Sequence, residues 1–405
     1  MPPCWLDHAD EQPPAVEILA VENGLLHTPS RTLLPHTPTF FNVNALPFAY
    51  EPTAACPGWL SFLNSLWPDD PSSIATLQEW FGYALLPDTS QQKILLLIGQ
   101  PCSGKGTIAR ILHALLGIEN VASPTLSGLA TNFGLEPLIG KLLATVADAR
   151  LSGSHSLVVE RLLSISGEDA LTVDRKNRTH WTGKLDTRIM VLTNELPRFH
   201  DQSSALPRRF IVLRTAQSFY GREDPGLTQR LLVELPGILN WALAGLDRLR
   251  ERGHFLQPES GQGDVELLHD AASPVSAFVR DCCRLDPAYQ CRRTISITPI
   301  SGTWRRRGIP VAGQEHFARD LLAAVVRGRV RDASGVISPP LTSEKRRNAW
   351  LQRRVRARQG STRLSTSRKL ACLRCPFSRD QWNRPLTCLT RCRNPRKTEG
   401  FPRQG

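Results

Sequence analysis

Short runs of consecutive apolar residues alternate with helical patterns through the middle of the chain. The runs are KILLLI (93–98), LLATVA (142–147), RIMVLT (188–193) and FIVLR (210–214). Strands that are buried on both faces of a parallel sheet have such near-continuous apolar sequences, and the intervening TIARILHALLG is typical of a covering helix. The pattern therefore predicts an α/β core with a parallel sheet from about residue 90 to 215.

Amphipathic helices are predicted on both sides of this core. Two precede it, with Ser72 or Ser73 expected to cap the second, and a longer helical segment, GLTQRLLVELPGILNWALAGLDRLRERG, follows it. The apolar positions of the first two helices recur at spacings of three and four. They are Trp59, Phe62, Leu63 and Leu66 in one and Ile74, Leu77, Trp80, Phe81 and Leu85 in the other.

The remaining segments predict further parts of the chain. Residues 1–55 are rich in Pro with short apolar runs, which indicates a small irregular or β-rich segment. Two short helical patterns either side of TWRRRG suit a small DNA-binding module of the helix-turn-helix or winged-helix type. The expected organisation is thus 1–55, a helical region 56–90, the core with its helices 91–255, the module 265–335, and a basic, disordered tail 336–405.

The net charge of +13 belongs to the tail. Residues 327–405 contain 21 Lys and Arg against 4 Asp and Glu, which leaves a net charge of −4 for residues 1–326. A polyanionic partner is therefore expected for the tail only. The start MPPCWLDHADEQ has neither a basic nor an apolar stretch, and no run of about 18 apolar residues occurs, so we expect a cytoplasmic protein that does not bind membranes.

The ten cysteines are interpreted as reduced thiols rather than as a disulfide framework. Four in the tail have the spacing C-x₂-C-x₁₂-C-x₃-C, which is compatible with tetrahedral zinc. A disordered basic segment that adds salt-sensitive affinity for DNA is the alternative. These cysteines are Cys372, Cys375, Cys388 and Cys392.

The sequence between the first apolar run and the next helix reads GQPCSGKGT. A strand that leads into a glycine-rich loop and at once into a helix is the context of a P-loop, in which main-chain N–H groups cradle phosphates and a lysine neutralises them. We therefore predict that the loop binds the phosphates of ATP. Its residues are Gly99, Gln100, Pro101, Cys102, Ser103, Gly104, Lys105, Gly106 and Thr107.

Gly106 stands where a P-loop usually has the Ser or Thr hydroxyl that binds Mg²⁺. Thr107, one position later, either supplies this hydroxyl through a shifted helix start or contacts a phosphate while water completes the metal shell. In both interpretations Lys105 is the phosphate-binding cation, and ATP and Mg²⁺ are the expected cofactors.

Polar residues mark the ends of the later apolar runs. Asp148 and Asn194 follow two of them, where the carboxyl edge of a parallel sheet presents ligands. Asp148 is predicted to hold the metal, with a capping role as the alternative. Asn194 orients water or senses the γ-phosphate, or else starts a turn before Pro197. Arg208 and Arg209 precede the last run and are either an arginine finger acting on a neighbouring subunit or a solvated face.

The order of these motifs resembles the superfamily 3 helicase domain of phage and plasmid primase-helicase proteins. The resemblance is carried by GQPCSGKGT, ATVAD, VVERLLSISGEDALTVDRKN, TRIMVLTNELP and ALPRRFIVLR. The upstream HTPTFFNVNALPFAYEPTA and the helical stretch after it are similar to the region that precedes that domain. The resemblance covers roughly residues 15–330, and the members that this chain resembles most also have GKGT in the loop.

This resemblance implies an AAA+-like ATPase core that forms a homo-hexamer and moves along single-stranded DNA during replication. By position it assigns Lys105 and Thr107 to the P-loop, Asp148 to the second motif, Asn194 to the sensor, and Arg208 or Arg209 to the finger. It also implies a DNA-contacting hairpin in DRKNRTHWTGK, for which an ordinary exposed hairpin is the alternative. The hairpin residues are Arg175, Lys176, Arg178, Trp181 and Lys184.

Two features depart from the family pattern. Related second motifs have an acidic pair or a Glu, whereas Asp148 is followed by Ala149 and Arg150, so the acid that activates water is not identified. No primase domain fits ahead of residue 15, so primer synthesis is expected from a separate polypeptide or from a missing upstream part. A separate primase or other replication proteins are the expected partners. The candidate acids are Glu160, Glu168 and Asp169.

Two other classes of function stay open. GQPCSGKGT is also similar to the P-loop of adenylate kinases, so phosphoryl transfer to a nucleoside monophosphate is one alternative, although such kinases usually have this loop near the chain start. A non-catalytic DNA-binding remnant that uses residues 273–335 and the basic tail is the other.

Overall fold

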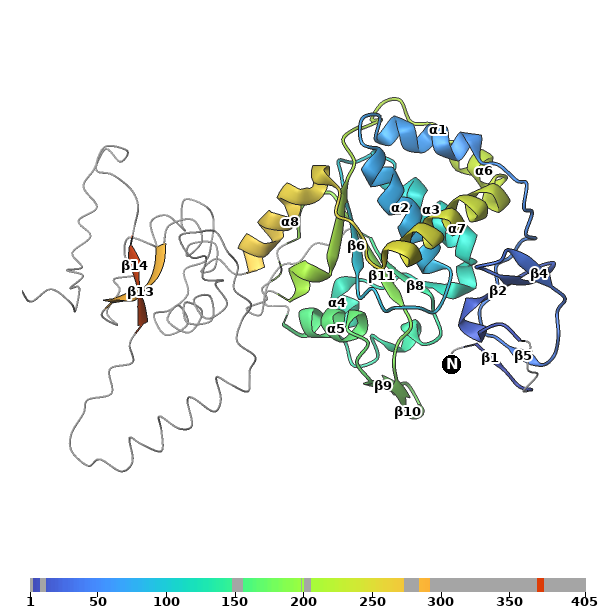
Figure 1. Ribbon diagram of the computed structural model, residues 1–405, viewed down its shortest axis with the longest axis horizontal. Helices are drawn as coiled ribbons and strands as arrows, with labels where there is room; N and C mark the ends of the chain where they lie inside the picture. The colour runs from blue at the N-terminus through green and yellow to red at the C-terminus, as the bar shows by residue number, and fades with distance from the viewer. Residues whose placement is uncertain are drawn as a thin grey trace, which may run out of the picture. The chain divides into compact units, whose positions relative to one another are not determined.

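A computed structural model describes residues 3–7, 12–147, 156–197, 199 and 205–272, together with the backbone of two further strands (Figure 1). The chain divides into two compact units, residues 1–272 and 273–405. In the second unit, β13 (Arg284–Cys291) pairs antiparallel with β14 (Leu370–Arg374). The remainder of the predicted winged-helix-like module, the tail and the side chains of its cysteines lie outside the described residues.

The first unit is built on a five-stranded sheet in the order β12-β6-β11-β8-β7, in which every pairing is parallel. The four predicted apolar runs form four of these strands, so the prediction of an α/β core with a parallel sheet is confirmed. Only β7 has no counterpart among them, because two residues are too few to give a pattern. The strands are β6 (Ile94–Ile98), β7 (Val121–Ala122), β8 (Leu143–Val146), β11 (Arg188–Thr193) and β12 (Phe210–Arg214).

The strand registers define two edges of the sheet. Ile98 of β6 pairs with Thr193 of β11 and with Arg214 of β12, so the three strands finish together at the carboxyl edge. Ile94 pairs with Phe210 at the opposite, amino edge. Residues that follow β6 and β11 therefore emerge side by side.

Successive side chains of the strands point to opposite faces, and each face has its own core. Leu95 and Leu97 belong to one hydrophobic cluster, and Leu96 and Ile98 to the other. The first cluster is covered by α1 (Pro57–Leu66), α2 (Pro71–Ala84), α3 (Lys105–Leu116), α6 (Leu227–Leu232) and α7 (Leu235–Arg252). The second is covered by α4 (Leu126–Leu129), α5 (Ser156–Ser166) and α8 (Glu259–Ala272).

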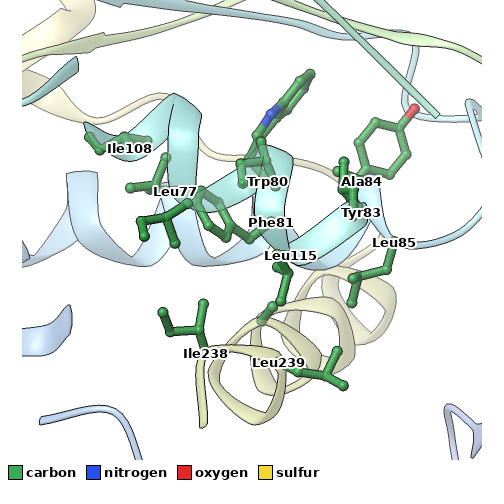
Figure 2. Close-up of a cluster of buried hydrophobic side chains, with 14 of the residues drawn as sticks. Leu77, Trp80, Phe81, Tyr83, Ala84, Leu85, Ile108, Leu115, Ile238 and Leu239 are labelled. Atoms are coloured by element: carbon green, nitrogen blue, oxygen red, sulfur yellow. The ribbon is translucent and has the colours of Figure 1, made fainter. Parts of the chain in front are cut away.

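The two predicted helices before the core are confirmed as α1 and α2. Figure 2 shows Phe81 of α2 in a cluster with Leu115 of α3 and Ile238 of α7. The predicted cap is wrong, because Asp70 occupies the N-cap and its carboxylate accepts a hydrogen bond of 3.0 Å from the Ser73 amide. A carboxylate also complements the positive end of the helix dipole, which a serine hydroxyl does not.

Helices α2 and α7 approach each other closely through two glycines. A Cβ on Gly82 would lie 2.4 Å from the Ala242 carbonyl oxygen, and one on Gly245 would lie 2.4 Å from that of Gln78. The same interface buries Glu79, whose carboxylate pairs with Arg248 at 2.7 Å and also with Arg252. Helix α2, which precedes the P-loop in sequence, therefore packs as an integral layer of the core.

The N-terminal segment is β-rich, which is one of the two forms that the sequence left open. It contains an antiparallel three-stranded sheet in the order β2-β3-β4 and a pair of short strands, β1 and β5. The side-chain Nδ2 of Asn44 donates a hydrogen bond of 2.7 Å to Oδ1 of Asn120, which attaches this segment to the core. The bounds are β1 (Cys4–Trp5), β2 (Ile18–Val21), β3 (Gly24–His27), β4 (Thr32–Leu34) and β5 (Phe40–Phe41), with 3₁₀ helices η1 (Ala15–Glu17), η2 (Ile118–Asn120) and η3 (Glu136–Leu138).

Candidate nucleotide site

The P-loop joins the end of β6 to the start of α3, as the sequence predicts. Cys102 and Gly104 have φ angles of 57° and 80°, so the chain turns through left-handed conformations before the helix. Gly104 is the N-cap and has no side chain to bond the first amides of α3. These amides point away from the helix with the positive end of its dipole, an arrangement that suits an anion.

Lys105 folds back over the loop. Its Nζ donates hydrogen bonds to the carbonyl oxygens of Gly99 and Gln100, both at 2.7 Å, and to Ser103 Oγ at 3.1 Å. Partial burial lowers the pKa of the Lys105 ammonium group. All three acceptors are neutral, so a phosphate oxygen would be a stronger partner for this ammonium group.

A cavity of about 900 Å³ opens above the loop. One wall is α1 and the loop from Pro101 to Thr107, another is Asn194 at the end of β11, and a third is the chain between Phe219 and Glu234. An ATP molecule fits a cavity of this volume, which lies within the usual range for ligand sites of about 300–1,000 Å³.

A segment after β12, here called the strap (Thr215–Gly226), is held against the P-loop by hydrogen bonds. Ser218 Oγ donates to the Pro101 carbonyl oxygen and the Phe219 amide donates to that of Cys102, each at 2.9 Å. Thr215 Oγ1 also donates to Ser103 Oγ at 2.9 Å. The sequence gives no pattern for this segment, since its contacts are mainly with backbone atoms of a loop that lies 110 or more residues earlier.

The strap brings charged side chains into the cavity wall. Arg222, Glu223 and Asp224 line the cavity, and Asp224 forms an ion pair with Arg230 of α6. The Glu223 carboxylate accepts a hydrogen bond from the Cys102 thiol of the loop. Hydrogen bonds that the carboxylate accepts from its own main-chain amide, from the Gly221 amide and from that thiol lower the pKa of Glu223. The carboxylate is therefore charged at neutral pH.

Asn194 is exposed in the cavity wall beside the loop. The turn after β11 is closed by its neighbour, because Thr193 Oγ1 donates to the Glu195 carbonyl oxygen at 2.6 Å and accepts from the Glu195 amide at 3.2 Å. The threonine hydroxyl thus performs the turn-forming role that the sequence left open for Asn194.

Thr107 lies in the cavity wall on the first turn of α3 and is 9% exposed. Its Oγ1 accepts a hydrogen bond of 3.1 Å from Arg110 Nη2. The predicted metal ligand Asp148 lies outside the described residues. Within the described part of the chain, no cluster of three or more His, Cys, Asp or Glu side chains could hold a metal ion.

Arg208 and Arg209 are in the 3₁₀ helix η4 (Leu206–Arg209), at the amino edge of the sheet. The five residues of β6 separate this edge from the P-loop, or about 16 Å at 3.3 Å per residue. Neither arginine therefore reaches the cavity. Arg209 Nη1 donates to the Ser166 carbonyl oxygen at 3.3 Å and to the Gln92 side chain, whereas Arg208 is exposed.

The segment predicted to contact DNA is an antiparallel hairpin of β9 (Leu171–Arg175) and β10 (Arg178–Gly183), which projects from the body of the unit (Figure 1). Lys176 and Arg178 are exposed at its tip, while the Arg175 guanidinium donates to the Thr179 carbonyl oxygen at 2.9 Å.

The other two hairpin residues lie at its base. Trp181 packs against the second hydrophobic cluster. Lys184 Nζ forms an ion pair with Glu168 at 2.6 Å. The structure thus separates an exposed cationic tip from a base that attaches the hairpin to the core.

The three candidate acids for water activation do not lie around the cavity. Hydrogen bonds from Lys184 and Thr89 lower the pKa of Glu168. Glu168 lies at the amino edge of the sheet, because the Gln92 side chain, just before β6, donates to the carbonyl oxygen of the preceding Gly167. Asp169 follows it directly, and Glu160 is exposed on α5. None of the three lines the cavity.

Fold and site together define an α/β protein with a P-loop-like core. Two family models match parts of the chain. One, described as "D5 N terminal like", matches residues 7–68. The other, described as "Family of unknown function (DUF5906)", matches residues 97–209, and so includes the P-loop, Asn194 and both arginines of η4.

Solved structures of the NrS-1 C-terminal region are also similar to this chain. An apo structure in the A form matches with a TM-score of 0.46 and 19% identity, covering 68% of this chain and 64% of that chain. Another apo structure matches with a TM-score of 0.47 and 16% identity, covering 80% and 77%. This chain therefore spans 64% of the first of these structures. Among the described residues, no helix combines the length and apolar character needed to cross a bilayer.

Proposed function

We propose that this protein is an ATP-dependent DNA helicase or translocase that acts in phage or plasmid replication. The observation that carries the proposal is the cavity over the P-loop, which is lined by Lys105 and Thr107 at the start of α3 and by Asn194 directly after β11. These are a phosphate-binding cation, a hydroxyl and an amide, which are parts that nucleotide hydrolysis requires. The motif order in the sequence and the match to the family described as "D5 N terminal like" support a role in replication.

The described side chains fit the phosphates of ATP and offer one donor for Mg²⁺. Thr107 Oγ1 lines the cavity, and Asp148 is proposed as the second donor, with water completing the shell. Bound Mg²⁺ supplies charge neutralisation at the phosphates. Lys105 holds the phosphates through its ammonium group, and Asn194 orients the attacking water through its side-chain amide.

The hairpin links the nucleotide site to DNA in this proposal. Lys176 and Arg178 at its tip carry the charge needed to bind the phosphates of single-stranded DNA. After β10 the chain passes through Lys184 directly into β11, which ends at the cavity with Asn194. Binding at the tip and hydrolysis in the cavity are thus connected by one continuous stretch of chain.

The position of Arg208 supports action in trans. Because it lies exposed at the amino edge, away from its own cavity, it can reach a phosphate only in a neighbouring subunit. We therefore propose a homo-hexameric ring in which Arg208 completes the site of the next subunit.

The decisive experiment compares wild-type protein with Lys105→Ala and with the matched control Lys141→Ala. ATP hydrolysis with and without single-stranded DNA, strand unwinding, and the mass in the presence of ATP are measured. We expect a hexamer with DNA-stimulated hydrolysis and unwinding that Lys105→Ala abolishes and Lys141→Ala leaves intact. Stimulated hydrolysis that persists in Lys105→Ala contradicts the proposal.

The same measurements distinguish the two alternatives. Phosphoryl transfer to a nucleoside monophosphate without stimulation by DNA would identify a kinase. DNA binding without ATP hydrolysis would identify a non-catalytic DNA-binding protein.

A further inference from the structure

The space beside Gly106 is occupied by a guanidinium group. A Cβ placed on Gly106 would lie 3.3 Å from Arg110 Nη1, which is closer than most side-chain contacts. Position 106 is where a P-loop usually carries the hydroxyl that binds Mg²⁺. Arg110 stands one helical turn later on the same face of α3, so its side chain extends back over this position.

Two hydrogen bonds hold Arg110 in this place. Nη2 donates to Thr107 Oγ1 at 3.1 Å, and Nε donates to Thr228 Oγ1 of α6 at 3.3 Å. Nη1 has no hydrogen-bond partner among the described residues. Arg110 itself lines the cavity. A guanidinium carries five N–H groups in a fixed plane, so these two bonds leave donors available to a ligand.

The other arginines of the cavity differ from Arg110. Arg230 is neutralised by Asp224. Arg222 belongs to the strap, whose hydrogen bonds to the loop are made with Pro101, Cys102 and Ser103 rather than with α3. Of the three arginines, Arg110 is the one that belongs to α3, the helix after the P-loop, and whose guanidinium group lies beside Gly106.

We infer that Arg110 is a phosphate-binding residue of the nucleotide site, and that glycine at 106 leaves the space for its guanidinium group. The inference rests on the proposed function, since it assumes that the cavity holds nucleotide phosphates. Phosphate oxygens are charged acceptors, whereas Thr107 and Thr228 are neutral ones, so phosphate is the stronger partner for the free N–H groups. With Lys105 and Arg110 both facing the phosphates, nucleotide binding depends less on Mg²⁺ than in a P-loop with a single cation.

The test measures binding of ATP by calorimetry, once with Mg²⁺ and once with EDTA. Wild-type protein is compared with Arg110→Ala, Arg110→Lys, Gly106→Ser and Thr228→Val. The last variant removes the contact of Arg110 with α6 but keeps the cation. Thermal melting verifies that each variant is folded.

Wild-type protein is expected to bind ATP in EDTA, and Arg110→Ala is expected to weaken this binding by at least about 10-fold, as for loss of a charge-assisted hydrogen bond. Arg110→Lys should retain part of the affinity, and Thr228→Val nearly all of it. Gly106→Ser should crowd the guanidinium and make binding more dependent on Mg²⁺.

Different results overturn different statements. Equal affinity of wild-type and Arg110→Ala protein in EDTA overturns the role of Arg110 and leaves the proposed function standing. If Thr228→Val loses as much affinity for ATP as Arg110→Ala, Arg110 acts only by joining α3 to α6, and its phosphate-binding role is also overturned. Wild-type protein that binds no ATP under either condition refutes the proposed function itself.

Discussion

The Gly99 amide donates a hydrogen bond of 3.2 Å to the carbonyl oxygen of Thr193. This bond continues the pairing of β6 with β11 by one step beyond the end of β6. It fixes the first residue of the P-loop against the residue that precedes Asn194. The main chain that leads into Asn194 is therefore held beside the phosphate-binding loop by a main-chain bond.

Substitution of Asn194 should separate ATP binding from hydrolysis. Asn194→Ala keeps Lys105 and the loop amides but removes the amide that orients water, so we expect hydrolysis to fall by about 100-fold, as for loss of one positioned donor. ATP affinity should change little. The control is Asn64→Ala, on the exposed side of α1. A loss of affinity that accounts for the loss of rate would contradict the assigned role.

The two arginines of η4 should behave differently. Arg208→Ala is expected to reduce hydrolysis by about 1,000-fold without lowering the melting temperature, as for loss of an arginine finger. Arg209→Ala should mainly lower the melting temperature, because its guanidinium bonds Ser166 and Gln92. Mixing the inactive Arg208→Ala and Lys105→Ala proteins should restore some hydrolysis. No recovery in assembled mixtures would argue against action between subunits.

Cations at the tip and at the base of the hairpin should have different roles. Lys176→Ala and Arg178→Ala should each weaken binding of single-stranded DNA and reduce its salt dependence by about one unit of slope. Lys184→Ala breaks the ion pair with Glu168, so it should affect stability more than the salt slope. Fluorescence anisotropy of labelled single-stranded DNA across a salt series measures both the affinity and its salt dependence. An unchanged slope in both tip variants would exclude the tip from the DNA contact.

The N-cap of α2 gives a prediction about pH. Burial raises the pKa of Asp70, but hydrogen bonds from Ser260, Ser72 and Ser73 outweigh it and lower the pKa to about 2 from 3.8. A carboxyl group whose pKa is lower in the folded than in the unfolded chain stabilises the folded state at pH values above its unfolded pKa. This stabilisation is therefore complete above pH 4 and is lost as the pH falls toward 2. Asp70→Ala should cost about 1 kcal/mol of unfolding free energy near neutral pH.

Urea unfolding between pH 2 and neutrality measures the effect. The difference between wild-type and Asp70→Ala protein should shrink as the pH falls. The exposed neighbour provides the control, since Asp69→Ala should show no such convergence. A difference that stays constant to pH 2 would mean that the cap does not depend on the carboxylate charge.

Local patterns predicted the sheet and its phosphate loop because both depend on residues close in sequence. The continuous apolar runs of β6 and β11 indicate strands that are buried on both faces of the sheet. The loop GQPCSGKGT is recognised because it follows a strand and precedes a helix. The strap and Arg110 were missed because their roles arise from contacts that no local pattern encodes. Ser218 meets Pro101, and Thr228 meets Arg110, only after the chain has folded.

The sequence pattern also could not predict which hairpin residues are exposed and which contact the core. Arg175, Lys176, Arg178, Trp181 and Lys184 form one basic and aromatic stretch, yet the fold buries part of Trp181 and neutralises Lys184. Period-two alternation predicts which side chains share a face of a strand. It does not predict which end of the hairpin meets the core.

The close contact of α2 with α7 has a consequence for dissecting the protein. Gly82 and Gly245 bring the two helices together, so truncation at the start of the P-loop strand would expose the apolar face of α7. Loss of Trp80 alone should cost about 3–5 kcal/mol. A fragment limited to residues 97–209 contains the phosphate loop but lacks strand β12, helices α1, α2, α6 and α7 on one face of the sheet, and α8 on the other. The smallest autonomous unit is therefore expected to extend from the N-terminal strands to α8.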